Sequence, residues 1–131
     1  MKSNLRLSPR QSSVGLSVAL RIIAGWQASP TQACKILRIS TSTYRRFVQG
    51  HNVGRRLDQD QQQRVALVIG IHASLREVFE NPKNVTGFTS LINDNPFFEG
   101  RTPLEVMSQG SIIAIYETSK RVAGLTSLGE K

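Results

Sequence analysis

Apolar residues in this chain recur at spacings of three and four, and no segment alternates with period two for long enough to form a strand. The pattern therefore predicts an all-α fold. The clearest case is a helix over residues 12–26, whose expected buried face is Leu16, Ala19, Leu20, Ile23 and Trp26. At 131 residues the chain has room for one ordinary domain or for two small helical subdomains that share a core.

Start and stop signals divide the remaining sequence into helices. Residues 29–32 read Ser-Pro-Thr-Gln, which combines an N-cap serine, a proline at the first helical position and a capping-box glutamine. Ser40 or Thr41 can cap a following helix, and Gly50 ends it. The expected helices are 30–37, 41–49, 58–80, 85–92, 103–109 and 112–123, with Gly124 as the last stop. The expected inward stripe of the long helix is Val65, Val68, Ile69, His72, Leu75 or Arg76, and Phe79.

Acidic residues are absent from the first part of the chain. Residues 1–57 carry ten Lys or Arg and no Asp or Glu, whereas residues 58–131 carry seven and nine. The two parts thus have formal charges of +10 and −2 within a net charge of +8. Because unopposed cations bind polyanions by displacing counterions, the first part is expected to bind phosphate, although charge alone also fits a solvated cationic surface.

Several classes of protein are excluded by composition. The longest apolar run, residues 65–71, is too short to span a membrane, and the first residues lack the apolar core of a secretory signal, so a cytoplasmic protein is expected. A single cysteine excludes an internal disulfide framework, and two histidines give no metal-ligand spacing. We therefore expect no cofactor and no metal.

The sequence also argues against catalytic activity, because no nucleophile lies beside a base and no carboxylates are paired for catalysis. Cys34 is expected to be a small buried residue and His72 a core residue. His51 lies in a basic loop. Glu77, Glu80 and Arg76 read as a solvated face.

The sequence predicts a helix-turn-helix within residues 12–57. Two short helices are joined there by three residues, and the small residues Ala33 and Cys34 lie where the helices cross. Tyr44, Phe47 and Val48 are expected to point inward. An ordinary αα-hairpin has the same spacing, but the acid-free flanks favour DNA binding. The expected DNA contacts are Ser29, Thr31, Gln32, Arg38, Thr41, Ser42, Thr43, Arg45, Arg46, Gln49, Arg55 and Arg56, with Thr41, Ser42 and Arg45 as the first base readers.

Arg38 occupies a turn position that is often glycine, because a left-handed backbone disfavours a side chain there. Arg38 can instead adopt a different turn and contact phosphate. Ahead of this domain, residues 1–11 are polar and carry Pro9, and they are expected to form a flexible basic arm.

Residues 95–107 read Asn-Pro-Phe-Phe-Glu-Gly-Arg-Thr-Pro-Leu-Glu-Val-Met and precede Gly110 and a final helix. This string resembles the signature of the Xre/MbcA/ParS antitoxin toxin-binding domain. The resemblance covers residues 58–131, and the preceding part is similar to the Xre-like helix-turn-helix of that family. Within the string, Gly100 permits the turn, Thr102 and Glu105 form a capping box, and the expected core residues are Phe97, Leu104 and Met107. Residues 90–92 depart from the Trp-Leu that the family often shows before the turn.

The resemblance implies a dimeric antitoxin that neutralises a co-expressed toxin, usually one with a NAD-consuming RES domain, by occluding its active site with the C-terminal region. In this sequence the corresponding stretch is residues 121–131, expected to follow the last helix; a frayed tail is the alternative. The expected toxin contacts are Lys120, Arg121, Leu125, Leu128 and the terminal Lys131.

A homodimer is expected because one helix-turn-helix reads too few base pairs for tight specific binding, and the candidate interface residues are Val65, Ile69, Ile112, Ile113 and Tyr116. The sequence thus favours an antitoxin that also represses its own operon by binding operator DNA. The alternative is a stand-alone helix-turn-helix repressor whose C-terminal domain serves dimerisation or ligand sensing. An RNA-binding protein would use the same charge but needs an aromatic platform that this chain lacks.

Overall fold

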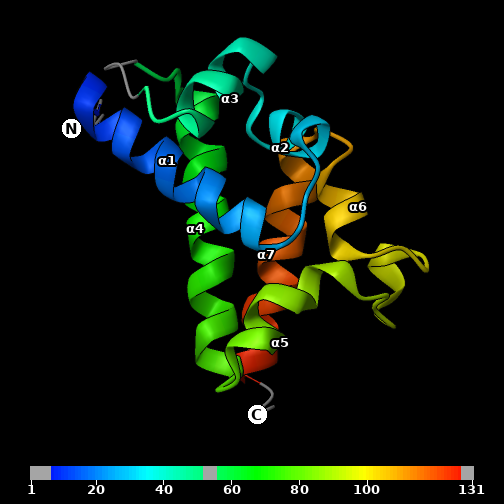
Figure 1. The fold of residues 1–131 in the computed structure, drawn as a ribbon. Helices are drawn as coiled ribbons and strands as arrows, with labels where there is room; N and C mark the ends of the chain where they lie inside the picture. The colour runs from blue at the N-terminus through cyan, green and yellow to red at the C-terminus, as the bar shows by residue number, and fades with distance from the viewer. Residues whose placement is uncertain (1–6, 52–55, 128–131) are drawn as a thin grey trace, which may run out of the picture.

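The computed structural model describes residues 7–51 and 56–127, and every regular element within these ranges is helical, which confirms the predicted all-α fold. Two single-turn 3₁₀ helices, η1 and η2, connect the later α-helices (Figure 1). The elements are α1 Pro9–Gly25, α2 Pro30–Leu37, α3 Thr41–Val48, α4 Gln59–Val78, α5 Pro82–Gly87, η1 Phe88–Ser90, η2 Pro96–Phe98, α6 Pro103–Met107 and α7 Ile112–Ser127.

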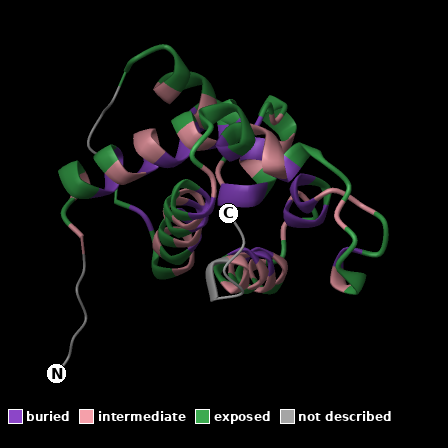
Figure 2. Cartoon of the chain, turned by 90° about the horizontal axis from the view of Figure 1, so that it is seen from below, coloured by how far each residue is buried: buried purple, intermediate pink, exposed green. Residues whose placement is uncertain are grey.

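The long helices α4 and α7 lie side by side, and α1 crosses α4. The short pair α2 and α3 sits at one end of α4, whereas α5 lies at the opposite end (Figure 1). Buried residues gather on the inner sides of the helices and exposed residues on their outer sides (Figure 2). One hydrophobic core contains residues from both parts of the chain, including Trp26, Ile36, Val68, Met107 and Ile115, each fully buried.

The first helix begins at Pro9, three residues earlier than predicted. Ser8 is its N-cap: the Ser8 hydroxyl accepts from the Gln11 amide at 3.1 Å, and the Gln11 side chain accepts from the Ser8 amide at 2.9 Å. Pro9 occupies the first helical position, where its missing N–H costs nothing. Residues 9–11 therefore belong to α1 and not to a flexible arm, while residues 1–6 lie outside the described residues.

Further boundaries differ from the prediction, and the helix predicted over 103–109 ends at Met107. The helix expected at residues 85–92 begins earlier, at Pro82 with Asn81 as its cap, and it tightens into η1 at Phe88. The last helix continues through Gly124 to Ser127, because glycine permits a left-handed stop without imposing one. Arg121 and Leu125 therefore lie on α7, as Lys120 does, and not on a tail after it.

The buried stripe of α4 is shifted from the prediction. Ile69, His72 and Phe79 are only half-buried and Arg76 is exposed. The shift arises because α4 packs against α1 on one side and α7 on the other. Hydrophobic periodicity in the sequence indicates one buried face, but it does not show how far burial extends around a helix that two neighbours cover. The buried residues of α4 are Arg64, Val65, Val68, Ile71, Leu75 and Val78.

The aromatic residue buried in the 95–107 segment is Phe98 and not Phe97. The Phe97 ring meets the Phe98 ring edge-on at 5.1 Å, and the Arg121 guanidinium lies 4.3 Å from its centroid. Leu104 and Met107 are buried as expected, and Gly100 has a φ of +82° at the turn. This segment is therefore held against α7 by an aromatic and cationic contact.

Candidate nucleic-acid interface

Local capping signals build the α2–α3 pair as the sequence predicted. Ser29 caps α2, with its hydroxyl accepting from the Gln32 amide at 3.1 Å and the Gln32 side chain accepting from the Ser29 amide at 2.9 Å. Ser40 caps α3 by accepting from the Thr43 amide at 3.1 Å. Three residues, 38–40, join the two helices, which is the connection of a helix-turn-helix.

Arg38 adopts the left-handed conformation, with φ 56° and ψ 49°, so the expectation of a different turn is wrong. Its guanidinium pairs with two carboxylates: Nε donates to Asp60 Oδ2 at 2.6 Å, and the other end of the fork donates to Asp58. The pKa of the Asp58 carboxyl is lowered, first by the backbone hydrogen bond from Gln61 and then by Arg38. Asp58 and Asp60 lie some twenty residues from Arg38 in the sequence. Their contacts with Arg38 offset the energetic cost of its left-handed conformation.

Arg64 links the first turns of α4 to the end of α2. The residue is only 5% exposed, and its Nη1 donates to the carbonyl oxygens of Ile36 at 3.1 Å and Lys35 at 3.3 Å. Its Nε donates to Asp60 Oδ2 at 2.8 Å. The last carbonyls of a helix lack partners within the helix and carry partial negative charge, so a buried guanidinium satisfies them well.

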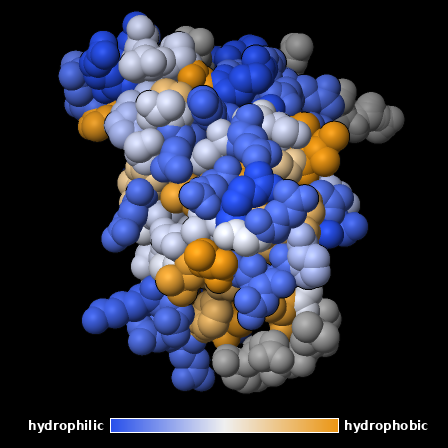
Figure 3. Space-filling model, turned by 90° about the vertical axis from the view of Figure 1, so that its right-hand side faces the viewer, coloured by the Kyte–Doolittle hydropathy of each residue, from blue (hydrophilic) through white to orange (hydrophobic). Residues whose placement is uncertain are grey.

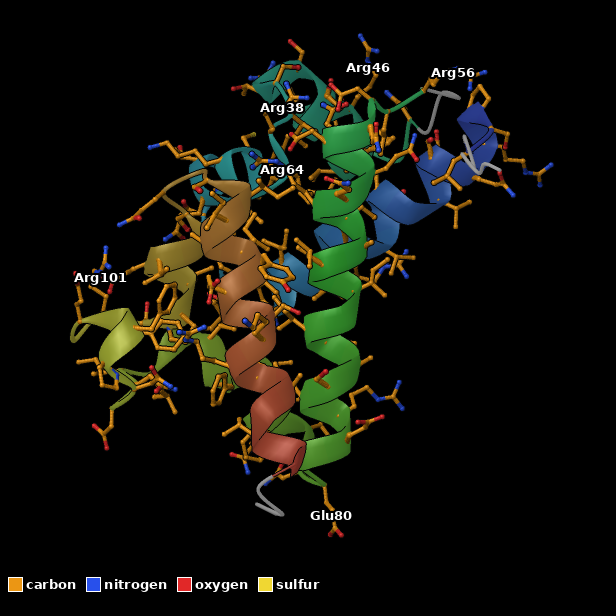
Figure 4. The ribbon with its side chains drawn as sticks, turned by 180° about the vertical axis from the view of Figure 1, so that it is seen from behind. Arg38, Arg46, Arg56, Arg64, Glu80 and Arg101 are labelled. Atoms are coloured by element: carbon orange, nitrogen blue, oxygen red, sulfur yellow. The ribbon has the colours of Figure 1, made fainter. Side chains whose placement is uncertain are left out.

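Sequence reasoning did not identify Arg64 as part of this site. The signal available was its position four residues after Asp60, which allows an ion pair along one helix face. Asp60 thereby accepts from both Arg38 and Arg64, and Gln61 Nε2 donates to the Arg38 carbonyl at 2.9 Å. The beginning of α4 is thus fixed to the turn between α2 and α3 (Figure 4).

The outward face of α3 carries most of the predicted base readers. Thr43 is a correction, because it is only 5% exposed and its Oγ1 accepts a hydrogen bond from Ser40 Oγ at 3.0 Å. Val48 is a second correction, since it is 62% exposed and does not point inward, whereas Tyr44 and Phe47 are half-buried. The exposed residues on α3 and at its end are Thr41, Ser42, Arg45, Arg46 and Gln49.

The predicted flanking contacts divide into free and engaged side chains. Thr31 is exposed at the start of α2, whereas the side chains of Ser29 and Gln32 are committed to the capping box. Arg56 is exposed, and its Nη1 donates to the Leu7 carbonyl at 3.2 Å; Arg55 lies outside the described residues. Arg46 and Arg56 lie at one end of the molecule, and Glu80 lies at the opposite end (Figure 4). The end that carries α3 is therefore cationic, which favours phosphate.

The predicted toxin contacts that the structure describes lie toward the end of α7. Lys120 is exposed, with its Nζ 5.7 Å from the centroid of the Tyr116 ring. Arg121 is half-buried, pairs with Glu117 and stacks on Phe97, and Leu125 is half-buried. Leu128 and Lys131 lie outside the described residues.

An apolar groove of about 500 Å³ runs between α4 and α7, and its lining includes three of the five candidate interface residues. Ile113 and Tyr116 are 68% and 50% exposed, whereas Val65 is buried beneath the surface and is not available to a partner. Ile69 is half-buried and does not line the groove. The lining residues are Gln63, Ala66, Leu67, Ile112, Ile113 and Tyr116.

Of the side chains considered for catalysis, Cys34 lies on α2 and His72 on α4. Cys34 is half-buried within α2, and burial raises the pKa of its thiol. His72 is half-buried on α4, where desolvation and then the charge of Arg76 lower its pKa, so it is neutral at pH 7. Within residues 7–51 and 56–127, no three His, Cys, Asp or Glu side chains gather as a metal site would require.

Comparison with known proteins identifies the first part of the chain. The family model of the antitoxin Xre-like helix-turn-helix domain matches residues 5–70, half of the chain. Searches among curated proteins and among solved structures found no match. The matched segment runs from the start of α1 into the middle of α4, so it contains both the predicted reading face and the Arg38–Asp60–Arg64 contacts. Among the described residues, no helix is long and apolar enough to cross a membrane.

Proposed function

Because the chain belongs to the family of antitoxins with an Xre-like helix-turn-helix domain, we propose that it represses its own operon as a homodimer on operator DNA and neutralises a toxin encoded beside it. The observation that carries the first half of this proposal is the exposed face of α3. That face presents hydrogen-bond donors and cations, with the exposed Val48 at its end, and α3 belongs to the acid-free segment 1–57 of the chain. A duplex is the polyanion that such a helix fits, since an α-helix enters its major groove.

Roles on α3 follow from position. Thr41 and Ser42 lie in the first turn, which meets base edges in helix-turn-helix complexes, and Arg45 follows one turn later. Arg45 suits a guanine, because a guanidinium can donate two hydrogen bonds to O6 and N7. Arg46 and Gln49, nearer the end of α3, contact the sugar-phosphate backbone or flanking bases.

The occupant of the groove between α4 and α7 is a second copy of this chain. Ile112 starts α7 and Gln63 lies in the first half of α4, so the groove lies in the half of the molecule nearest α2 and α3. A two-fold axis through the groove and parallel to α4 keeps both α3 helices at the same end, as two half-sites on one face of a duplex require. Exposed Ala66 and Gly70 allow the two α4 backbones to approach closely.

We expect Ile113→Asp to convert the dimer into a monomer, because the charge would lie in the apolar groove of the interface. Size-exclusion chromatography with light scattering should report half the mass, with an unchanged far-ultraviolet circular dichroism spectrum. The matched control is Leu91→Asp, since Leu91 is 66% exposed but lies outside the groove. A dimer that persists in Ile113→Asp, or one that is lost equally in Leu91→Asp, would place the interface elsewhere.

Neutralisation of the toxin is assigned to the end of α7. The contact of Arg121 with Phe97 holds this part of α7 against the 95–98 turn. The exposed Lys120 side chain therefore extends from a part of α7 whose position is fixed. The resemblance of residues 58–131 to the toxin-binding domain supports a RES-type toxin whose active site is occluded by this region. The near-neutral charge of residues 58–131 also suits a protein partner better than DNA.

Lys120→Glu combined with Leu125→Asp is expected to abolish rescue from the neighbouring toxin while operator binding stays within about twofold of wild type, since neither residue is near α3. Growth and the NAD content of cells that co-express the toxin measure the first effect. Lys83→Glu on α5 is the control for reversed charge. Full rescue by the double variant would remove the end of α7 from the mechanism. A wild-type chain that rescues nothing would favour the stand-alone repressor.

A further inference from the structure

A hollow of about 480 Å³ lies between the helix-turn-helix and the connection from α6 to α7. From the helix-turn-helix its lining includes Thr31, Cys34, Lys35 and Thr41, and from the connection it includes Gln109 and Gly110. The connection lies outside the segment that matches the family model, which ends at residue 70. The hollow is therefore shared by the two parts of the chain.

Contacts within the connection hold Gln109 in a defined place. The Gln109 amide donates to the Val106 carbonyl at 3.2 Å, and the Gly110 amide donates to the Met107 carbonyl at 3.2 Å. Gly110 has a φ of +92°, and a Cβ added to it would lie 3.9 Å from the Lys35 carbonyl oxygen, so the connection is in close contact with α2. In Figure 1 the connection lies beside α2. Gln109 itself is exposed, which leaves its amide available.

The chemistry of the hollow suits a phosphate. Thr31 and Thr41 contribute hydroxyls, Lys35 an ammonium group and Gln109 a side-chain amide. Arg38 also lines the hollow, with its guanidinium paired with Asp58 and Asp60, and no carboxylate is itself among the lining residues. Thr41 is the first residue of α3, so the hollow opens beside the end of α3 that faces the major groove. On this side of the molecule, hydrophilic residues predominate over the upper part, where α2 and α3 lie (Figure 3).

We propose that this hollow binds a backbone phosphate of the operator duplex and that Gln109 makes the contact from outside the helix-turn-helix. The inference rests on the proposed operator binding and adds a second part of the chain to the DNA-binding surface. Phosphate contacts of this kind fix the register of a protein on its duplex without reading bases. The C-terminal half then sets the angle at which α3 enters the groove.

Introducing a negative or a positive charge at position 109 tests the contact. With a duplex that carries the promoter region upstream of the gene, Gln109→Glu should weaken binding by about three- to tenfold and Gln109→Lys should strengthen it by a similar factor. Asn84→Glu and Asn84→Lys make the same changes in net charge on α5, at the opposite end of the molecule, and should change affinity less than twofold. Equal responses at positions 109 and 84 would overturn the inference.

Cys34, the single cysteine of the chain, lines the hollow and supplies a second readout that does not depend on affinity. The operator duplex should slow alkylation of Cys34 by a maleimide at least fivefold, and inorganic phosphate at millimolar concentration should not. Protection by inorganic phosphate alone would indicate a general anion site and would overturn the assignment to DNA.

Together these experiments distinguish failure of the phosphate contact from failure of operator binding itself. Loss of binding in the Arg45 and Arg46 variants, with no response at position 109 and no protection of Cys34, would overturn the phosphate contact only. A wild-type chain with no affinity for its promoter duplex would overturn both.

Discussion

Replacing Arg45 and Arg46 together with alanine is expected to lower affinity for operator DNA by about 10²- to 10³-fold, because each guanidinium that meets a base or phosphate contributes about 1–3 kcal/mol. Both side chains are exposed and contribute little to the core, so the variant should keep its fold. Electrophoretic mobility shift or fluorescence anisotropy with the promoter duplex measures the loss. Rescue from the toxin should remain, since this variant leaves α7 unchanged.

Salt dependence distinguishes lost contacts from lost net charge. The double variant should show a slope of log affinity against log salt that is shallower by about 0.9, since each phosphate contact contributes about 0.9 and only Arg46 of the pair is assigned to the backbone. The matched control is Arg76→Ala with Lys83→Ala, which removes the same two charges from exposed positions on α4 and α5. A control variant that binds as weakly as the Arg45 and Arg46 variant would show that general charge, and not α3, determines binding.

Local chemistry explains the parts of the fold that the sequence could predict. A capping box lies within four residues, so the starts of α2 and α6 could be read directly from Ser29 and Thr102. The start of α1 carries the same signal at Ser8, whereas hydrophobic periodicity alone places that start three residues too late. Features set by packing were missed, because periodicity gives a face and not the neighbours that cover it: Thr43 is buried, Val48 is exposed and the stripe of α4 is shifted.

In the candidate site, too, local features could be predicted from the sequence and long-range contacts could not. Of the six DNA contacts expected on α3 and at its end, five are exposed, because helical geometry fixes which positions share a face, whereas Thr43 is buried. The role of the first acids after residue 57 could not be predicted. The position of Asp58 and Asp60 in the sequence indicates only that carboxylates suit the positive end of a helix dipole, and Asp58 does cap α4. The structure adds that both carboxylates hold Arg38, a contact between residues twenty or more apart that no local pattern reveals.

The change from an acid-free segment to an acid-containing one after residue 57 therefore has a structural role, in addition to separating the expected DNA-binding part from the expected toxin-binding part. The acid-free segment ends where Asp58 and Asp60 begin to fix the turn between α2 and α3, so the first acids in the chain hold the helix-turn-helix in position. Neither carboxylate lies on α3, and both are paired with arginines. The cationic face of α3 thus remains unopposed while its support is held by ion pairs.

Arg64→Met is expected to lower the free energy of unfolding by about 2–4 kcal/mol, because it leaves the buried Ile36 carbonyl, the partly buried Lys35 carbonyl and one side of Asp60 without a donor. Arg76→Met is the matched control on the same helix: Arg76 is exposed, and its loss should cost less than about 0.5 kcal/mol. Urea denaturation followed by circular dichroism measures both. Equal stability of the two variants would show that the buried contacts of Arg64 contribute nothing net.

The same substitution should weaken operator binding even under conditions where the variant is fully folded. Without Arg64 the end of α2 loses its attachment to α4, so amides in the α2–α3 turn should exchange hydrogen faster while those in the α4–α7 core remain protected. Arg64→Lys keeps the charge but cannot donate from a planar fork to Asp60 and two carbonyls together, and it should restore stability only in part. Full recovery of DNA affinity in Arg64→Lys would mean that charge alone positions α3. Partial recovery, with faster exchange confined to the turn, is the result expected if the guanidinium geometry holds the reading helix in place.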